Sequence, residues 1–247
     1  MHMRIVFDGT RMLAVALFLA GCKTDPAPDS GFLARPEMMR EQRERAPFDR
    51  VWVKPGFNKN FYNGLLISQV NTDYLLENTG WAAANPASKR LEQSAMDLAS
   101  FTRETFIKEF RGDPRRRFPI IDRPGPGVAV LELAIVELVP SHAVIGALGL
   151  VAPFAKAPAV AVASKLGGKS TCVAIEGRLR DSQTREVLMM FADREEPPFR
   201  ILSAKAVTWY GDAEDSIEMW AKQLVELANT PPTQTVNDAP AFTLNPW

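Results

Sequence analysis

The sequence has few of the side chains that most often carry catalysis or bind metals. Its 247 residues include two cysteines and two histidines. With Cys22 modified as argued below, Cys172 is the remaining thiol, and one thiol forms neither an intramolecular disulfide nor a zinc cluster. A Ser-His-Asp triad or a Cys-His pair would have to use His142, and no G-x-S-x-G nucleophile elbow accompanies it. We therefore expect no bound metal.

The chain also lacks an excess of charge of either sign. Lys and Arg together number 29, as do Asp and Glu, so the protein offers no electrostatic footprint for nucleic acid. The dense basic cluster is Arg115-Arg116-Arg117, which lies beside Asp113 and Asp122. We interpret it as a solvated connection between a helix and a strand. We expect no nucleic-acid partner.

The stretch SKLGGKSTC at residues 164–172 resembles the end of a phosphate-binding loop. A P-loop reads G-x-x-x-x-G-K-[ST] and needs a strand before the loop and a helix after it. Here Ala163 occupies the position of the first glycine, and the residues after Ser170 alternate as those of a strand do. We expect Lys169 and Ser170 to be turn residues, and we expect no nucleotide or other cofactor.

The most specific motif lies at the N-terminus. Two arginines precede a short apolar run at residues 12–20, which is too short to span a bilayer and is typical of a signal-peptide core. The run ends in LAGC, with cysteine at position 22, and this pattern resembles the bacterial lipobox. The resemblance implies cleavage between Gly21 and Cys22, a diacylglycerol on the Cys22 thiol and an acyl chain such as palmitate on its amine. The alternatives are an ordinary secretory signal before a chance cysteine, and a buried N-terminal helix.

The lipid anchor has consequences for localisation. Acyl chains contribute about 0.8 kcal/mol per buried CH₂, so several chains anchor a protein without a transmembrane helix. In lipoproteins of this type an aspartate after the cysteine tends to retain the protein in the inner membrane, whereas Lys23 follows here. The resemblance thus implies the periplasmic face of the outer membrane. Residues 22–47 have mixed charge and little periodicity, and we predict that they form a flexible tether.

Apolar periodicity predicts one α+β domain over residues 48–229. The expected strands are at 51–53, 62–71, 118–122, 128–138, 171–180 and 186–193, of which the last two form a hairpin. A helix is expected over residues 86–112, with one apolar face formed by Leu91, Ala95, Leu98, Thr102, Thr105 and Phe106. A second is expected over residues 211–229, with a face formed by Ile217, Trp220, Leu224 and Leu227. We predict a mostly antiparallel sheet with two helices packed on one face, and a disordered tail over residues 230–247.

Several phrases of the sequence also occur together in a known family. They are the lipobox, SGFL, RVWVKPG followed by VNTDYL, FPIIDRPGPGVAVLELAI, a Gly- and Ala-rich insert, and WAKQL. In these phrases, over about residues 19–228, the chain resembles a family of Gram-negative envelope lipoproteins catalogued only as a domain of unknown function. None of the phrases is catalytic. The resemblance therefore implies an envelope lipoprotein and carries over no active-site residue.

The insert at residues 141–165, SHAVIGALGLVAPFAKAPAVAVASK, is unusually apolar. Pro153, Lys156 and Pro158 interrupt it, which argues against a membrane span. One interpretation is a buried helical hairpin or loop packed on the sheet. The other is an exposed surface for lipid or a protein partner, with candidate contacts at Val144, Leu148, Leu150 and Phe154.

Two classes of function follow. We favour a non-enzymatic scaffold or accessory binding module of the cell envelope, anchored in the outer membrane and docking envelope proteins through the insert. The alternative is a periplasmic hydrolase built on Asp193, on Glu195, or on Cys172 with His142. Asp193, Glu195 and Glu196 form an acidic cluster that we otherwise expect to be solvated. A cleft with convergent polar groups and shifted pKa values would favour the hydrolase, and a flat exposed insert would favour the binding module.

Overall fold

The computed structural model describes residues 26, 29–41, 46–78, 87–139, 172–196, 211–231 and 234–236. The predictions for the signal peptide, His142, the loop around Lys169 and the apolar insert fall outside these residues. So do the predicted cleavage and lipidation site and the candidate insert contacts, Gly21, Cys22, Val144, Leu148, Leu150 and Phe154.

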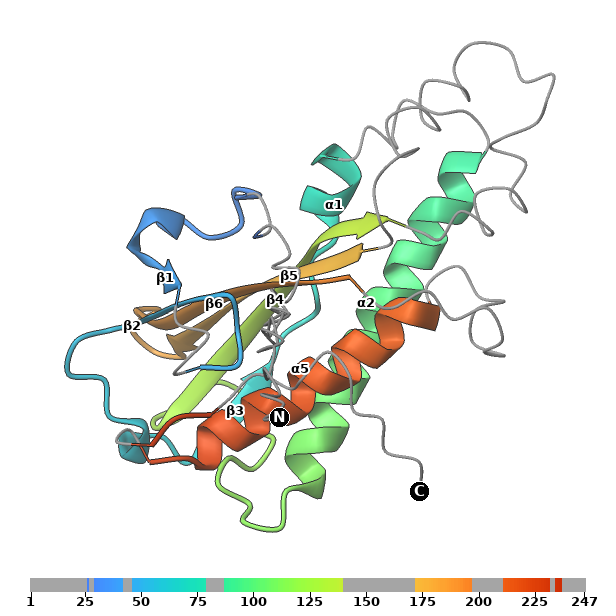
Figure 1. The fold of residues 1–247 in the computed structure, drawn as a ribbon. Helices are drawn as coiled ribbons and strands as arrows, with labels where there is room; N and C mark the ends of the chain where they lie inside the picture. Colours follow the sequence, from blue (N-terminus) through green and yellow to red (C-terminus); the bar gives the residue numbers. More distant parts are fainter. Residues whose placement is uncertain are drawn as a thin grey trace, which may run out of the picture.

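A six-stranded sheet forms the centre of the domain, in the order β1-β2-β6-β5-β4-β3 (Figure 1). The strands are β1 (Arg40–Glu41), β2 (Arg50–Val53), β3 (Gly64–Ile67), β4 (Val128–Val139), β5 (Cys172–Asp181) and β6 (Val187–Glu195). Neighbouring strands run antiparallel except for β3 and β4, which are parallel. The β5–β6 hairpin is as predicted, and Asp181 closes its turn by accepting hydrogen bonds from the amides of Gln183 and Thr184.

Two long helices lie across one face of this sheet (Figure 1). The helical segments are the short 3₁₀ turns η1 (Pro36–Met38) and η2 (Lys59–Phe61), and the helices α1 (Asp73–Asn78), α2 (Ala87–Gly112) and α5 (Gly211–Asn229). Both long helices coincide with the predicted ones. The α+β prediction, with two helices on one face of a mostly antiparallel sheet, is confirmed.

We call the side of the sheet under α2 and α5 the helix face. Side chains of a strand point alternately to the two sides, and the helix face receives the apolar set Leu131, Leu133, Ile135, Val173, Ile175, Met189 and Phe191. The predicted stripe of α2 packs on it, because Ala95, Leu98 and Phe106 are fully buried. Ile217 and Trp220 of α5 are fully buried as well. This face is the main core of the domain.

Gly177 of β5 has a specific packing role in that core. A Cβ atom at this position would lie 2.1 Å from the Phe191 ring, closer than real Cβ atoms approach other atoms. The ring therefore occupies the space above the glycine, and it stacks on Phe48 with 4.5 Å between centroids. A side chain at Gly177 would displace both aromatic rings.

A β-bulge in β4 changes which residues face the helices. The register against β5 shifts between Ile135 and Glu137. As a result Leu138 returns to the helix-face core, whereas Glu137 points to the other side, where it pairs with Arg194 of β6. The bulge thus adds a carboxylate to the second face of the sheet.

The structure differs from the sequence-based predictions in three places. The predicted strand at residues 118–122 is one isolated bridge, between Ile120 and Leu65. Of the predicted disordered tail, Val236 is buried. Within the predicted tether, residues 29–41 lie on the sheet instead of extending as free chain, because Phe32, Leu33 and Met39 are buried. We call residues 29–41 the strap, and the side of the sheet it covers the strap face.

Candidate functional site: the strap and the charged face of the sheet

The strap covers an apolar strip in the middle of the strap face. Phe32, Leu33 and Met39 form a cluster with side chains of three central strands, namely Ala134, Val136, Ala174, Met190 and Ala192. These sheet residues are mostly small, so the strap backbone can lie close to the strands. Burial of each large apolar side chain contributes about 1.5–3 kcal/mol, which accounts for the docking of the strap but not for its register.

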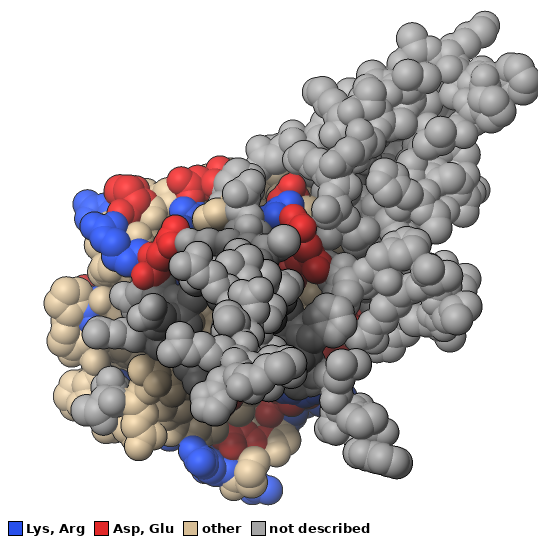
Figure 2. Space-filling view, in the orientation of Figure 1, with Lys and Arg blue, Asp and Glu red and all other residues tan. Residues whose placement is uncertain are grey.

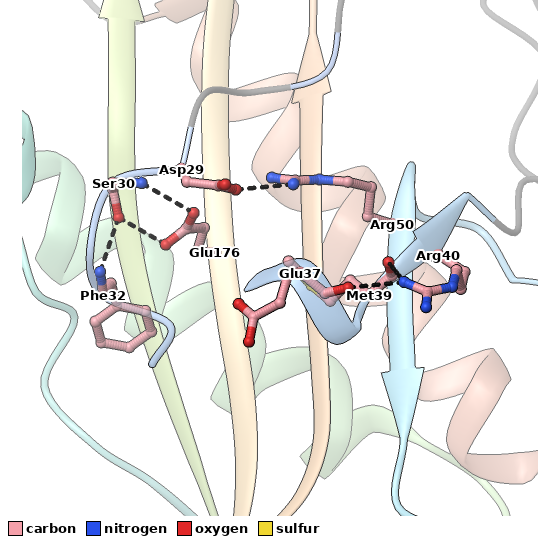
Figure 3. A network of polar contacts seen from close by, with 8 residues as sticks. All are labelled: Asp29, Ser30, Phe32, Glu37, Met39, Arg40, Arg50 and Glu176. Carbon is pink, nitrogen blue, oxygen red and sulfur yellow. Dashed lines mark hydrogen bonds and ion pairs between the residues drawn. The ribbon is translucent and has the colours of Figure 1, made fainter. Parts of the chain in front are cut away.

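Glu176 of β5 fixes that register through Ser30. The Ser30 hydroxyl donates to Glu176 Oε2 at 2.6 Å, and the Ser30 amide donates to Oε1 at 3.4 Å (Figure 3). The same hydroxyl accepts from the Phe32 amide at 3.1 Å, which turns the chain toward its buried ring. Glu176 is fully buried. Burial raises its pKa, while the hydrogen bonds from Ser30 and the charge of Arg50 act in the opposite direction.

Arg178, two residues farther along β5, contacts the strap in two ways. Its Nη1 donates to the Phe32 carbonyl at 2.8 Å, and its guanidinium carbon lies 4.4 Å from the centroid of the Phe32 ring. Glu132 of β4 accepts a hydrogen bond from Arg178 Nε and so orients the guanidinium. The Phe32 ring also makes a T-shaped contact with Tyr74 of α1, with 5.9 Å between centroids. Phe32 therefore lies in a defined pocket, stabilised by a cation–π contact.

The first residue of the strap, Asp29, forms an ion pair with the sheet. Asp29 Oδ1 lies 2.8 Å from Nη1 of Arg50 on β2 (Figure 3). The Asp29 side chain is 53% exposed, and pairs with an exposed partner contribute only about 0–1 kcal/mol. This contact adds little to stability. It does show where the chain that precedes the strap meets the sheet.

The candidate nucleophile Cys172 lies at the other end of the strap face and is not activated. It is buried beside the Glu137–Arg194 ion pair. Burial raises the pKa of the thiol to about 11, and the negative charge of Glu137 raises it further against the opposing effect of Arg194. Because the thiolate is the reactive form, this cysteine is inert at neutral pH.

The carboxylates of the predicted acidic cluster have different surroundings in the structure. The expectation that they are solvated is wrong for Asp193, which is 1% exposed on the helix face. Its carboxylate accepts from the Asp49 amide at 2.9 Å and from Trp220 Nε1 at 2.5 Å. Burial raises the pKa of Asp193 well above its usual value, and the negative charges of Asp49 and Glu195 raise it further. Glu196 pairs instead with Arg194, at 2.7 Å.

The basic cluster at residues 115–117 connects α2 to the sheet, as the sequence analysis expects, but Arg117 is not simply solvated. Its guanidinium donates to the carbonyl oxygens of Lys59 and Tyr62 at 2.7 and 3.1 Å. Lys59 in turn donates from Nζ to the Ala228 carbonyl at 2.7 Å, at the C-terminal end of α5. Lys59 thus places positive charge at the C-terminal end of an α-helix, where it is favourable, and Arg117 satisfies carbonyls around η2.

Sequence reasoning missed Ser30, Glu176 and Arg178. An indication was available in the alternation of β5, where Glu176, Arg178 and Arg180 share the face opposite Val173 and Ile175. Three charges on one side of a central strand require water or polar partners. The sequence does not say which, because the partner lies 146 residues away in the chain.

Two further results concern the described residues alone. Within the described ranges, which leave out 140–171 among others, no group of three or more His, Cys, Asp or Glu side chains could hold a metal ion. Among the helices built from these residues, none is long and apolar enough to cross a membrane.

Structural comparison finds similar folds at low identity. A PelC dodecamer from Paraburkholderia phytofirmans is 10% identical, with 70% of this chain and 94% of that chain covered and a TM-score of 0.37. A protein from Xanthomonas campestris, XCC0632 of family DUF330, is 11% identical, with 70% and 87% covered and a TM-score of 0.37. The lipoprotein GNA1162 from Neisseria meningitidis is 13% identical, with 68% and 99% covered and a TM-score of 0.23.

Sequence comparison is more informative about family membership. Comparison with curated proteins finds no match. A family model described as a protein of unknown function, DUF3313, matches residues 28–224, which include the strap, the sheet and most of α5. This confirms the resemblance drawn from the sequence to a family catalogued as a domain of unknown function. The chain belongs to the DUF3313 family.

Proposed function

We propose that this protein is a lipoprotein attached through Cys22 to the periplasmic face of the outer membrane, where it serves as a non-enzymatic scaffold or accessory binding module of the cell envelope. The observation that carries the proposal is the lipobox LAGC, followed after a short linker by the docked strap. An acylated cysteine followed directly by a segment fixed on the domain attaches the whole domain to the bilayer.

The contacts of the acidic residues favour a binding module over the alternative hydrolase. A general acid or base must reach its substrate, whereas the Asp193 carboxylate is enclosed by Trp220 and the Asp49 backbone. Glu196 is engaged by Arg194. The raised pKa of the Cys172 thiol also argues against a Cys-His pair at neutral pH.

The proposed binding surface is the apolar insert at residues 141–165. Residues 140–171, which contain it, connect the end of β4, at Val139, to the start of β5, at Cys172. Near these strand ends Arg194 pairs with Glu137 and Glu196. The apolar composition of the insert is that of the buried centre of a protein docking site. We assign partner or lipid contact to Val144, Leu148, Leu150 and Phe154.

The first experiment tests the anchor. Mass spectrometry of protein purified from membranes should show a chain that begins at an acylated Cys22, and Cys22→Ser should leave the protein uncut or soluble. Separation of inner and outer membranes then gives its location. An unmodified chain that begins at another residue would overturn the anchoring proposal.

The second experiment tests the binding surface by crosslinking and co-purification from intact envelopes. Val144→Asp and Leu150→Asp should reduce partner recovery while leaving the melting temperature nearly unchanged, because surface substitutions usually change stability by no more than about 0.5 kcal/mol. If both variants instead lose stability and recover partners normally per folded molecule, the insert belongs to the core and the proposed surface is wrong.

A further inference from the structure

The chain between the proposed lipid anchor and the strap is short. Asp29 follows Cys22 by seven residues. Because a fully extended chain spans at most about 3.6 Å per residue, the anchor lies no more than about 25 Å from Asp29. Without strap docking, the first fixed strand residue would be Arg50, which follows Cys22 by 28 residues. The corresponding limit would be about 100 Å.

We infer that the side of the domain that carries Asp29 faces the bilayer, and that the docked strap fixes this orientation by restricting the reach of the anchor. This inference rests on the proposed acylation of Cys22. The partner of this surface is the headgroup layer of the membrane that carries the anchor.

The contacts of the strap support a fixed orientation rather than loose attachment. Ser30 is bonded to a fully buried carboxylate, Glu176, and Phe32 is enclosed by Arg178 and Tyr74. Phe32, Leu33 and Met39 of the strap are at most 7% exposed. Through Ser30 and Asp29 the start of the strap is therefore held on the central strand β5 and on β2.

The charges near this side are compatible with close approach to a membrane. Lys or Arg and Asp or Glu side chains are interspersed along the upper left edge of the molecule (Figure 2), where Figure 1 places η1 and β1. In the strap, Arg35 and Arg40 accompany Asp29, Glu37 and Glu41. Because neither sign dominates, anionic headgroups neither repel nor strongly attract the edge, and the anchor sets the distance.

The opposite end of the sheet is expected to point away from the bilayer. Phe61 of η2 is 75% exposed, and the adjacent Tyr62 donates a hydrogen bond to Asp181, the last residue of β5. Ser30 contacts β5 at Glu176, five residues earlier. At about 3.4 Å per residue, the two points are separated by about 17 Å along the strand direction alone.

Energy transfer from the full lipidated protein to vesicles tests the orientation. The vesicles contain phosphatidylethanolamine, phosphatidylglycerol and a small fraction of acceptor-labelled lipid. Donor dyes are attached at Glu37→Cys in the strap and at Phe61→Cys in η2. The buried Cys172 does not compete for the dye, and the thiol of Cys22 carries lipid. Transfer should be at least two-fold more efficient from position 37 than from position 61.

Two variants show whether the strap is responsible. An insertion of about ten Gly and Ser residues after Asp25 extends the limit to about 60 Å without touching the strap, so transfer should fall and the difference between positions 37 and 61 should shrink. Phe32→Asp should shrink the difference by undocking the strap. Its melting temperature is measured in parallel, and the insertion serves as the independent variant if Phe32→Asp unfolds the domain.

The outcomes separate this inference from the proposed function. If Cys22 is not acylated and the protein does not float with vesicles, the anchor and the orientation both fail. If the protein is acylated and floats, but transfer is equal from the two positions or is unchanged by the insertion, the orientation is overturned and the anchor stands.

Discussion

The two faces of the sheet are closed by different means. On the helix face, α2 and α5 cover a continuous apolar surface, and fully buried side chains such as Leu98 and Trp220 fill it. On the strap face, an extended segment covers a narrow apolar strip between charged side chains, among them Glu132, Glu176 and Arg178. The helix face depends on apolar area, and the strap face depends on polar contacts that specify one position.

This difference assigns separate roles to the two faces. Apolar burial is large but non-directional, so it stabilises the domain without defining where a particular chain segment lies. A hydrogen bond from Ser30 to a buried carboxylate is directional, and a displaced strap would leave Glu176 unsatisfied. We therefore assign stability mainly to the helix face and the positioning of the N-terminal chain to the strap face.

The largest expected effect comes from Trp220→Ala on the helix face. Truncation of a fully buried tryptophan leaves a large cavity and removes the hydrogen bond to Asp193, so we expect a loss of about 3–5 kcal/mol in the free energy of unfolding. Denaturant titration measures it. Lys222→Ala on the exposed side of α5 is the matched control and should change stability by less than about 0.5 kcal/mol.

On the strap face, Phe32→Ala should have a smaller global effect and a distinct local one. We expect a loss of about 1–3 kcal/mol, because the strap can detach while the helix-face core persists. Trypsin should then cut after Arg40 before the domain unfolds, whereas the bond after Arg35 is protected by Pro36. Phe61→Ala, at a phenylalanine that is 75% exposed, should leave both stability and cleavage unchanged. Equal protection of the strap in both variants would contradict its docking through Phe32.

A pH titration distinguishes the buried acid of the helix face. The pKa of Asp193 is raised above its ordinary value of 3.8, so the folded state binds more protons than the unfolded state between the two pKa values. The contribution of Asp193 to stability therefore falls as pH rises through its folded-state pKa. The amide in Asp193→Asn cannot titrate. The free energy of unfolding of this variant should therefore decline less between pH 4 and pH 8 than that of the unmodified protein.

The same pH titration of stability, applied to Glu176→Gln, tests the buried acid of the strap face. Its pKa is also raised by burial, so this variant too should show a weaker decline of stability with pH. Asp113 and Asp181 act in the opposite direction because their pKa values are lowered. The contribution of these two aspartates to stability is lost only below about pH 4, so it does not overlap with the decline expected from Glu176 and Asp193 at higher pH. A decline as steep as that of the unmodified protein in both variants would refute this assignment.

The smallest expected effect comes from Asp29→Asn at the entry of the strap. The Asp29–Arg50 pair is half exposed on the aspartate side, so its removal should change stability by no more than about 0.5–1 kcal/mol. The effect should shrink in high salt, because salt screens exposed charges. Thermal melts at low and high ionic strength measure it. A loss much larger than that of Phe32→Ala would reverse the proposed ranking of the strap contacts.

The helix face was largely predictable because its information is local. The 3.6-residue period of α2 and the two-residue period of β5 and β6 can be recognised within short continuous stretches of sequence. The buried residues Ala95, Leu98 and Phe106 are those that the helical period selects. The predicted strand at residues 118–122 failed because Ile120 alone pairs with the sheet. Apolar residues in this short segment satisfy the pattern without making a ladder.

The strap was not predictable from local pattern, since its partners are distant. Residues 29–41 contain proline, glycine and mixed charges, which are also typical of a linker. The roles of Ser30 and Phe32 can be recognised only in the folded structure, where β5 places Glu176 and Arg178 opposite them. Likewise, the acidic cluster around Asp193 looks solvated in sequence. The neighbour that encloses it, Trp220, lies on a helix that follows later in the chain.

The bulge in β4 has a consequence for reading substitutions in this strand. Before it, odd-numbered positions such as Leu133 and Ile135 require apolar side chains, whereas after it the even-numbered Leu138 does. The buried apolar positions of β4 therefore change from odd to even residue numbers at the bulge. A variant library interpreted by strict alternation along the whole strand would assign Glu137 and Leu138 to the wrong faces. Deleting Val136 would remove the bulge and restore the alternation while Glu137 stays opposite Ala174 and Leu138 stays opposite Val173, so both side chains would keep their present faces.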